Sequence, residues 1–250
     1  EQAVTIAKKS PSIDGFVLPS EQPANDVGGR MDSSLLDLSS EDLLEQADAV
    51  LSHVKSLDER AVVTGGGVGV SATAGCLMSS EGILSTGLTT SHGIGLQVTL
   101  DVDGQLTSSY QGQSSRSQLP ELPDCIGRAV HWAQVTQNPL EVESQAIETP
   151  VLFTSEGFSP LFSMVVPPAM SGEKMVRKES FWSDRFNQQV VNPALSIYDD
   201  GLLEGGMASG SRDAEGVPRR RQHLVEKGRL TNMLWSTRDA AQQVAEGLSL

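Results

Sequence analysis

Residues 195–234 read LSIYDDGLLEGGMASGSRDAEGVPRRRQHLVEKGRLTNML, and this stretch decides the fold. Three runs in it are rich in strand-forming residues: Leu195–Tyr198, Gln222–Glu226 and Arg229–Trp235. Asp199-Asp200-Gly201 ends the first run, and Lys227-Gly228 joins the other two as a tight hairpin, because glycine supplies the positive φ that such a turn requires. The stretch therefore predicts three strands with long turns and no helix.

The turns of this stretch also carry a family resemblance. DDGLLEGG at 199–206, DAEGVPRR at 213–220 and LVEKGRL at 224–230 resemble the TldD/PmbA metalloprotease family, also called TldD/TldE. The chain is most similar to the PmbA/TldE side, which was once labelled a modulator of DNA gyrase. The resemblance extends over nearly the whole chain and is most specific from Val151 to Leu250.

Composition narrows the class of protein. The 250 residues carry 32 acids against 18 bases, a net charge of −14, which argues against a nucleic-acid partner because affinity for nucleic acid comes largely from phosphate neutralisation. No apolar run approaches the roughly 20 residues that span a bilayer, and no signal peptide is visible. Two cysteines form neither a disulfide framework nor a CxxC pair. We expect a cytoplasmic protein with no membrane partner.

Both ends suggest a fragment. Glu1 stands inside a helix-like segment, and Leu250 directly follows another. Members of the family that the chain resembles are considerably longer. We therefore expect two truncated domains, with residues 1–148 as the TldD/PmbA N-terminal or central domain and 149–250 as the start of the C-terminal domain.

The first domain is predicted to be α+β, with an antiparallel sheet between two helices. Ser39 or Ser40 caps a helix. The apolar stripe of that helix comprises Leu43, Leu44, Ala47, Val50, Leu51 and Val54. A second helix opens at Pro123. Its stripe comprises Leu122, Ile126, Ala129, Val130 and Ala133.

The sheet of this domain is expected between Ala61 and Tyr110. Residues 61–64, 68–78, 83–90, 96–102 and 105–110 form β-rich runs, which predict four to five antiparallel strands with one polar face. Asp103-Gly104 is a hairpin signal between alternating runs.

The second domain follows a polar connection, residues 138–149, and is predicted to be β-rich. We expect a short strand at Pro150–Thr154, a helix that begins near Glu156 and is disrupted at Pro167-Pro168, and another helix over Glu173–Gln188. A last helix is capped by Thr237. Its apolar positions are Ala240, Ala241, Val244 and Leu248.

The zinc motif of the family is missing from this sequence. By the resemblance, catalytic members carry HExxxH on the helix after the strand at 150–154, where two histidines ligate zinc and the glutamate acts as general base. Here no histidine stands between Pro150 and Met175, and the only acids are Glu156 and Glu173. We therefore predict no catalytic residue, no metal site and no cofactor in this chain, with zinc only in a TldD-type partner.

Other candidate sites have more ordinary interpretations. The four histidines His53, His92, His131 and His223 lack paired ligand spacing, and Cys76 and Cys125 are expected to be small core residues. Three further segments favour strand or turn structure over phosphate, calcium or nucleic-acid binding: Thr64–Gly69, Asp101–Gly104 and Arg219–Arg221.

Residues of the family motif remain as candidate contacts to a partner or peptide. They are Asp199, Asp200, Asp213, Glu215, Gly216 and Arg220. The acids among them could bind a cation or a peptide amine, although acids at such positions more often cap turns by accepting backbone N–H bonds.

The resemblance implies a non-catalytic PmbA/TldE-like subunit of a TldD-type zinc metalloprotease complex that acts on unfolded peptides. Its partners would be a TldD-type protease subunit or a second copy of itself, together with the peptide substrate. Two alternatives stay open: an active peptidase whose site lies in missing C-terminal sequence, and a stand-alone peptide-binding module. Zinc content separates the first two, and co-purification with a TldD-type protein separates the first from the third.

Overall fold

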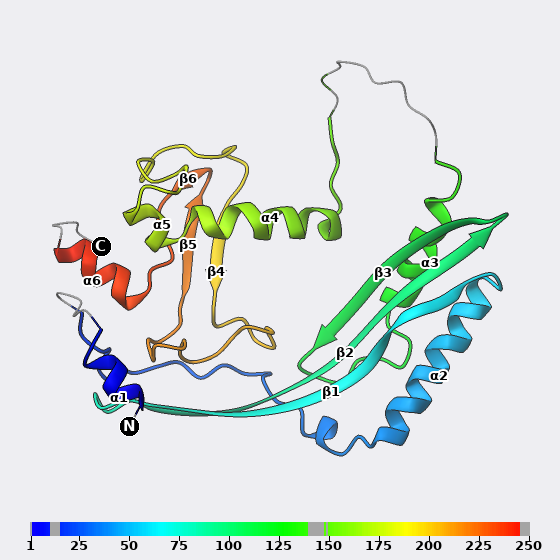
Figure 1. Ribbon diagram of the computed structural model, residues 1–250, viewed down its shortest axis with the longest axis horizontal. Helices are drawn as coiled ribbons and strands as arrows, with labels where there is room; N and C mark the ends of the chain where they lie inside the picture. The colour runs from blue at the N-terminus through cyan, green and yellow to red at the C-terminus, as the bar shows by residue number, and fades with distance from the viewer. Residues whose placement is uncertain (1, 11–15, 140–147, 149, 246–250) are drawn as a thin grey trace.

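The computed structural model describes residues 2–10, 16–139, 148 and 150–245, and these fall into two lobes (Figure 1). A short helix, α1 (Gln2–Ala7), and a 3-10 turn, η1 (Ser33–Leu36), precede the first lobe. Mixed helices and antiparallel sheets confirm the predicted α+β class. Most of the predicted connection 138–149, and Leu248 of the last helix, lie outside the described residues.

The first lobe is built on a three-stranded antiparallel sheet of order β1-β2-β3. Its strands are β1 (Val62–Met78), β2 (Leu84–Val102) and β3 (Gln105–Ser115). The prediction of four to five strands was wrong, because neighbouring runs are continuous. Pairing continues across the glycines of β1, where a bulge between Val63 and Gly65 absorbs the irregularity.

The predicted Asp103-Gly104 hairpin is confirmed. Asp103 has φ 53° and Gly104 has φ 83°, the left-handed pair that a two-residue turn requires, and Val102 pairs with Gln105 across it. The Asp101 carboxylate accepts the Gly104 N–H at 2.9 Å. Asp101–Gly104 is thus a turn, as the sequence indicated.

Helices α2 (Ser40–Leu57) and α3 (Cys125–Val135) cover one face of this sheet. Alternate residues of β2 point into the core: Ile94, Leu96, Val98 and Leu100. Gln97 and Asp101 between them are exposed, which confirms the polar second face. The helical stripes are narrower than predicted, since Leu44 and Leu51 of α2 remain 65% and 46% exposed.

The second lobe contains the β structure predicted for 195–234. Strands β4 (Ile197–Asp200), β5 (Arg221–Glu226) and β6 (Arg229–Leu230) form an antiparallel sheet in that order. Lys227 at φ 44° and Gly228 at φ 78° make the predicted hairpin turn. β6 is shorter than the predicted run to Trp235, because the chain leaves β5 after Leu230 and Leu234 forms a parallel bridge with Ser171.

Helix α4 (Ser155–Ala169) corrects the prediction that Pro167-Pro168 would break it. A proline there lacks the N–H that would bond to Ser163 or Met164. Both of those residues are exposed, so water can satisfy their carbonyls. The predicted strand at 150–154 does not form. This segment has no strand partner, and Leu152 is 95% exposed.

The remaining helices also differ in their ends from the prediction. Helix α5 spans only Gly172–Val176 instead of 173–188, since Lys178 takes a left-handed φ of 55°. Helix α6 spans Thr237–Ala245. Ser236 caps it instead of Thr237, because the Ser236 hydroxyl accepts the Asp239 N–H at 3.1 Å.

The β1–β2 ribbon extends beneath the second lobe and joins the two halves (Figure 1). Its tip is held by the N-terminal segment, where the Glu21 N–H donates to the Glu81 carbonyl at 3.3 Å. The same N-terminal segment also contacts the second lobe, where the Gly205 N–H donates to the Gly28 carbonyl at 3.1 Å. Among the residues described, no helix combines the length and apolar character needed to cross a bilayer.

Candidate functional site

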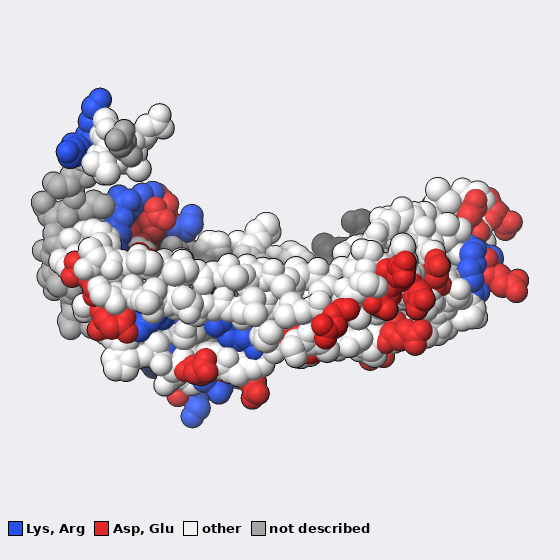
Figure 2. Space-filling view, turned by 90° about the horizontal axis from the view of Figure 1, so that it is seen from below, with Lys and Arg blue, Asp and Glu red and all other residues white. Residues whose placement is uncertain are grey.

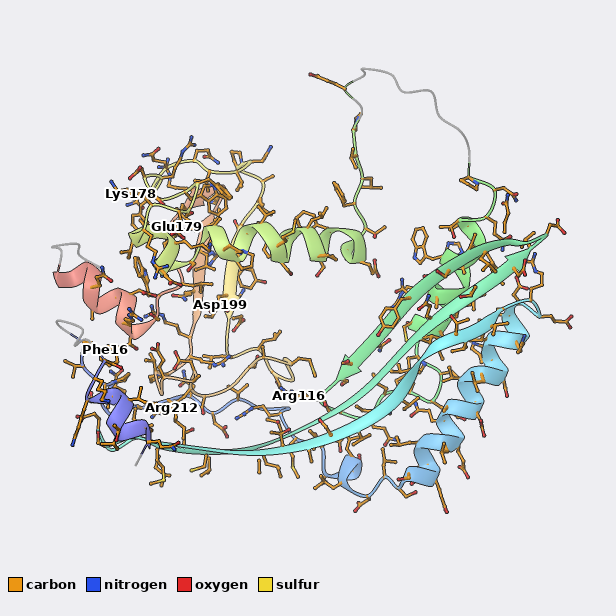
Figure 3. The ribbon with its side chains drawn as sticks, in the orientation of Figure 1. Phe16, Arg116, Lys178, Glu179, Asp199 and Arg212 are labelled. Carbon is orange, nitrogen blue, oxygen red and sulfur yellow. The ribbon has the colours of Figure 1, made fainter. Side chains whose placement is uncertain are left out.

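An open groove of about 540 Å³ lies beside β4 in the second lobe and brings together three of the six candidate residues. Asp199 enters it from β4, and Asp213 and Arg220 enter from the chain that leads into β5. Figure 3 shows Asp199 beside the strand, above the loops that face the ribbon. The groove therefore holds charges of both signs, whereas Asp200, Glu215 and Gly216 do not line it.

Asp213 and Asp200 organise turns. The Asp213 carboxylate oxygen Oδ1 accepts the N–H groups of Glu215 and Val217, each at 2.9 Å. Asp200 Oδ1 accepts the Leu202 N–H at 3.1 Å. Carboxylates bonded in this way hold the local backbone, so these two acids have a clear structural role.

Glu215 and Gly216 connect the turn that contains Asp213 to α6 and to the tip of the β1–β2 ribbon. The Glu215 carboxylate accepts the backbone N–H of Thr237 at 2.9 Å and its hydroxyl at 3.1 Å, at the start of α6. Gly216 is buried with φ 90°, and a Cβ there would lie 2.7 Å from Ile83 at the ribbon tip. The turn thus joins the ribbon to α6.

Asp199 and Arg220 are the candidates with groups left for a ligand. The Asp199 carboxylate is exposed and has no hydrogen-bond partner among the described residues. Arg220 donates through Nε to Gln222 at 3.2 Å, and no carboxylate in the described part of the chain pairs with its guanidinium. One acid and one base are therefore available to an amine and a carboxylate or carbonyl.

The rest of the groove wall was missed from the sequence. Gln22 and Pro23 come from the N-terminal segment, and Met233, Leu234 and Trp235 form an apolar side. Trp235 was expected as the end of a strand, with no ligand role. Gln22 lies about 200 residues along the chain from this wall and carries no local signal for such contact, because the contact is set by tertiary structure.

The residues of α4 do not fit the zinc site that the resemblance places there. This helix contains no histidine or cysteine, and its one acid is Glu156 in the first turn. The pKa of Glu156 is lowered, first by its own backbone N–H, and its carboxylate lies 3.9 Å from Arg128 Nε. A single carboxylate cannot make the three-ligand set of a catalytic zinc site.

The histidines lie apart. His92 is buried in β2, and His131 is exposed on α3. His223 stacks near Tyr198 in the second lobe, with ring centroids 5.9 Å apart. Within the described ranges, no group of three His, Cys, Asp or Glu side chains could hold a metal ion.

The cysteines behave differently from each other. Cys125 is fully buried, as predicted, and burial raises the pKa of its thiol. Cys76 is exposed on β1, which corrects the prediction of a core residue. Cys76 pairs with Thr86 in a part of the ribbon that β3 does not reach, since the described β3 pairs with β2 only from His92 onward.

Comparison with known proteins agrees with this architecture. The profile of the PmbA/TldA metallopeptidase C-terminal domain matches residues 146–246. An uncharacterized protein of Methanocaldococcus jannaschii is 25% identical over 86% of this chain and 49% of its own length. The metalloprotease PmbA of Escherichia coli O157:H7 is 27% identical over 65% of this chain and 36% of its own.

The fold itself matches a solved relative. The crystal structure of TldE from Thermococcus kodakarensis superposes with a TM-score of 0.83 at 21% identity, over 97% of this chain and 55% of that one. The chain thus spans about half the length of that protein, or less for the curated relatives. Residues 146–246 thus match the C-terminal domain profile of the PmbA/TldA metallopeptidases, and the chain as a whole has the fold of TldE.

Proposed function

We propose that the full-length protein is a PmbA/TldE-like, non-catalytic subunit of a TldD-type zinc metalloprotease complex that acts on unfolded peptides. The observation that carries this proposal is α4, where a family of metallopeptidases would hold its metal and where this chain has no zinc ligand. A water molecule without a metal or a general base has nothing to activate it.

Both hydrophobic cores of the described structure are well packed, although α4 carries no zinc ligands. The first core includes Leu96, Val98 and Ile126 at 2% exposure or less, and the second includes Val225 and Leu230 at 0%. Sequences that keep packing, capping and turn chemistry consistent specify a stable fold. A retained fold that lacks metal ligands favours binding over catalysis.

The groove beside β4 supplies a place for a peptide. Asp199 suits an amine, Arg220 suits a carboxylate or carbonyl, and Trp235 offers an apolar wall. The partner in this proposal is a TldD-type subunit in the cytoplasm, forming a heterodimer. A self-dimer and a stand-alone peptide-binding module are the other outcomes that a co-purification experiment would report.

Zinc content of the full-length protein tests the proposal. We expect elemental analysis to find far less than one zinc per chain, while a TldD-type protein from the same source, purified alongside, carries about one. Near-stoichiometric zinc that survives Glu156→Gln would instead favour an active peptidase with ligands outside residues 1–250. Zinc lost in that variant would refute our assignment of α4.

A further inference from the structure

A trough of about 320 Å³ lies between the β1–β2 ribbon and the turn that contains Ser211 and Arg212. Its floor is one face of the ribbon, where Gly75 pairs with Gly87 and Thr73 pairs with Thr89. Small and hydroxyl-bearing side chains thus leave this face open. Of the candidate motif residues only Asp213 lines the trough, and it is the one residue that the trough shares with the groove beside β4.

Arg30 reaches into this trough from the N-terminal segment. An ideal Cβ on Gly87 would lie 3.4 Å from Arg30 Nη2 and 3.5 Å from Nη1, so the guanidinium rests against a glycine of the floor. Gly210 is on another side, 3.8 Å from Nη2 by the same measure. Two residues without side chains therefore flank the cation.

Among the described residues, the Arg30 guanidinium has no hydrogen-bond or ion-pair partner. Its Nε is buried without a hydrogen bond, and no carboxylate or carbonyl in the described part of the chain receives its N–H groups. The one acid that lines the trough, Asp213, already accepts the N–H groups of Glu215 and Val217. A partly buried, unpaired cation is unfavourable unless something compensates its charge.

Neighbouring arginines show the contrast. Arg212, whose side chain is 8% exposed, donates to the Gly216 carbonyl at 2.9 Å and to Glu21 at 2.7 Å. Arg116 donates to the Thr90 carbonyl at 3.1 Å. Figure 3 shows both among the loops that face the ribbon. Arg116 Nε is buried without a bond, as Arg30 Nε is, but the terminal nitrogens of Arg116 and Arg212 have acceptors, whereas those of Arg30 have none among the described residues.

Charge distribution is consistent with an anion in this region. Figure 2 shows Asp and Glu side chains gathered over the end of the molecule that carries α2. The trough lies in the other half, beneath the second lobe, and its lining has two arginines against one acid. An anion therefore meets less repulsion here than the net charge of −14 suggests.

We propose that the trough binds an oxyanion, a carboxylate or a phosphate group, through the Arg30 guanidinium. The planar guanidinium offers parallel N–H donors that match such groups. Hydroxyls of Ser85, Thr89 and Ser211 line the same space and supply further donors. The carboxylate could be the C-terminus of a peptide, and the phosphate could be free in solution.

Calorimetric titration of the full-length protein tests this site. The probes are inorganic phosphate and one short peptide with a free C-terminal carboxylate or with an amidated C-terminus. We expect saturable binding of phosphate or of the free-carboxylate peptide. Arg30→Gln should weaken it at least ten-fold, whereas Arg185→Gln, which removes an exposed positive charge elsewhere, should leave it unchanged.

Gly87→Leu provides a second test that keeps the charge. Its Cβ would stand in ordinary contact with the guanidinium, 3.4 Å from Nη2, so the rest of the side chain must occupy space in the trough, while leucine is tolerated in a strand. We expect weaker oxyanion binding with an unchanged melting temperature. If the peptide with a free C-terminus binds and the amidated peptide does not, the ligand is a peptide carboxylate. If inorganic phosphate binds and neither peptide does, the ligand is a phosphate group.

Three results would overturn the proposal. They are no saturable binding of either probe, equal affinity in Arg30→Gln and wild type, and equal affinity in Gly87→Leu and wild type. If Arg30→Gln does not fold, the Gly87→Leu comparison decides the matter alone.

Discussion

His92 is a buried side chain whose protonation is linked to folding. Its Nε2 lies 3.0 Å from the Gln46 side-chain oxygen, and its Nδ1 accepts the Leu119 N–H at 3.0 Å. Accepting that bond requires the neutral ring, and burial lowers the pKa of His92. Its position between the predicted β-rich runs 83–90 and 96–102 gave no sign of its burial.

The consequence is a pH dependence of stability. Because the folded pKa lies below the unfolded value of about 6.5, the unfolded chain binds the proton more tightly, and stability falls as pH drops below about 6.5. Urea unfolding at several pH values between 7.5 and 5 should show this decline. It should be smaller in His92→Gln and kept in His131→Gln, an exposed control. Equal declines in wild type and His92→Gln would contradict the linkage.

Gly228 has a strict backbone requirement at the hairpin turn. At φ 78°, a Cβ would lie 2.5 Å from the Val191 carbonyl oxygen and would also meet Gln189. We expect Gly228→Ala to lower the free energy of unfolding by about 1–3 kcal/mol. Gly127→Ala is the matched control, because Gly127 is exposed on α3 with open space at its Cβ, and it should stabilise by about 0.5–1 kcal/mol. Similar effects on thermal unfolding at both positions would argue against the hairpin geometry.

The candidate residues show what a motif can and cannot predict. The turn-capping interpretation of Asp200 and Asp213 follows from local chemistry, and the hydrogen bonds of both acids agree with it. That Asp199 and Arg220 share a groove with Gln22 depends on contacts between distant segments. A single sequence carries no local signal for such contacts.

At the scale of the elements, a capping box stabilises the N-terminus of α2. The Ser39 hydroxyl accepts the Asp42 N–H at 3.2 Å, and the Asp42 carboxylate accepts the Ser39 N–H at 2.7 Å, a capping box. Ser39→Ala should cost about 1 kcal/mol of unfolding free energy. Ser52→Ala, at an exposed position within the same helix, should be neutral or slightly stabilising. Equal losses in the two variants, measured by urea unfolding, would show that the cap is not the cause.

Elements with strong local signals were predicted well. The cap and period of α2, the Asp103-Gly104 turn and the Lys227-Gly228 turn are all encoded within a few residues. The wrong predictions concern segments whose structure depends on contacts with residues distant in the sequence. The segment 150–154 has β-forming residues but no strand partner, and the predicted helix 173–188 ends early at the left-handed Lys178. Propensity is a weak guide against such tertiary effects.

At the scale of the whole molecule, the long two-stranded β1–β2 ribbon was not predicted from the sequence. Glycine-rich runs suggested several short strands, yet the ribbon continues to a tip where Ile83 packs against Gly216 of the second lobe. The trough lies between this ribbon and the turn above it, whereas the groove is formed by the second lobe and residues 22–23 of the N-terminal segment. The residues of both come together only when segments far apart in the sequence pack against each other.

The central claim concerns what the full-length protein does beside a catalytic partner. The direct measurement is the rate of hydrolysis of an unfolded peptide by this protein alone, by a TldD-type protein from the same source alone, and by the two mixed. We predict no cleavage by this protein alone and a rate for the mixture above that of either component, abolished by a metal chelator. Metal-dependent cleavage by this protein alone, at the rate of the mixture, would contradict the account.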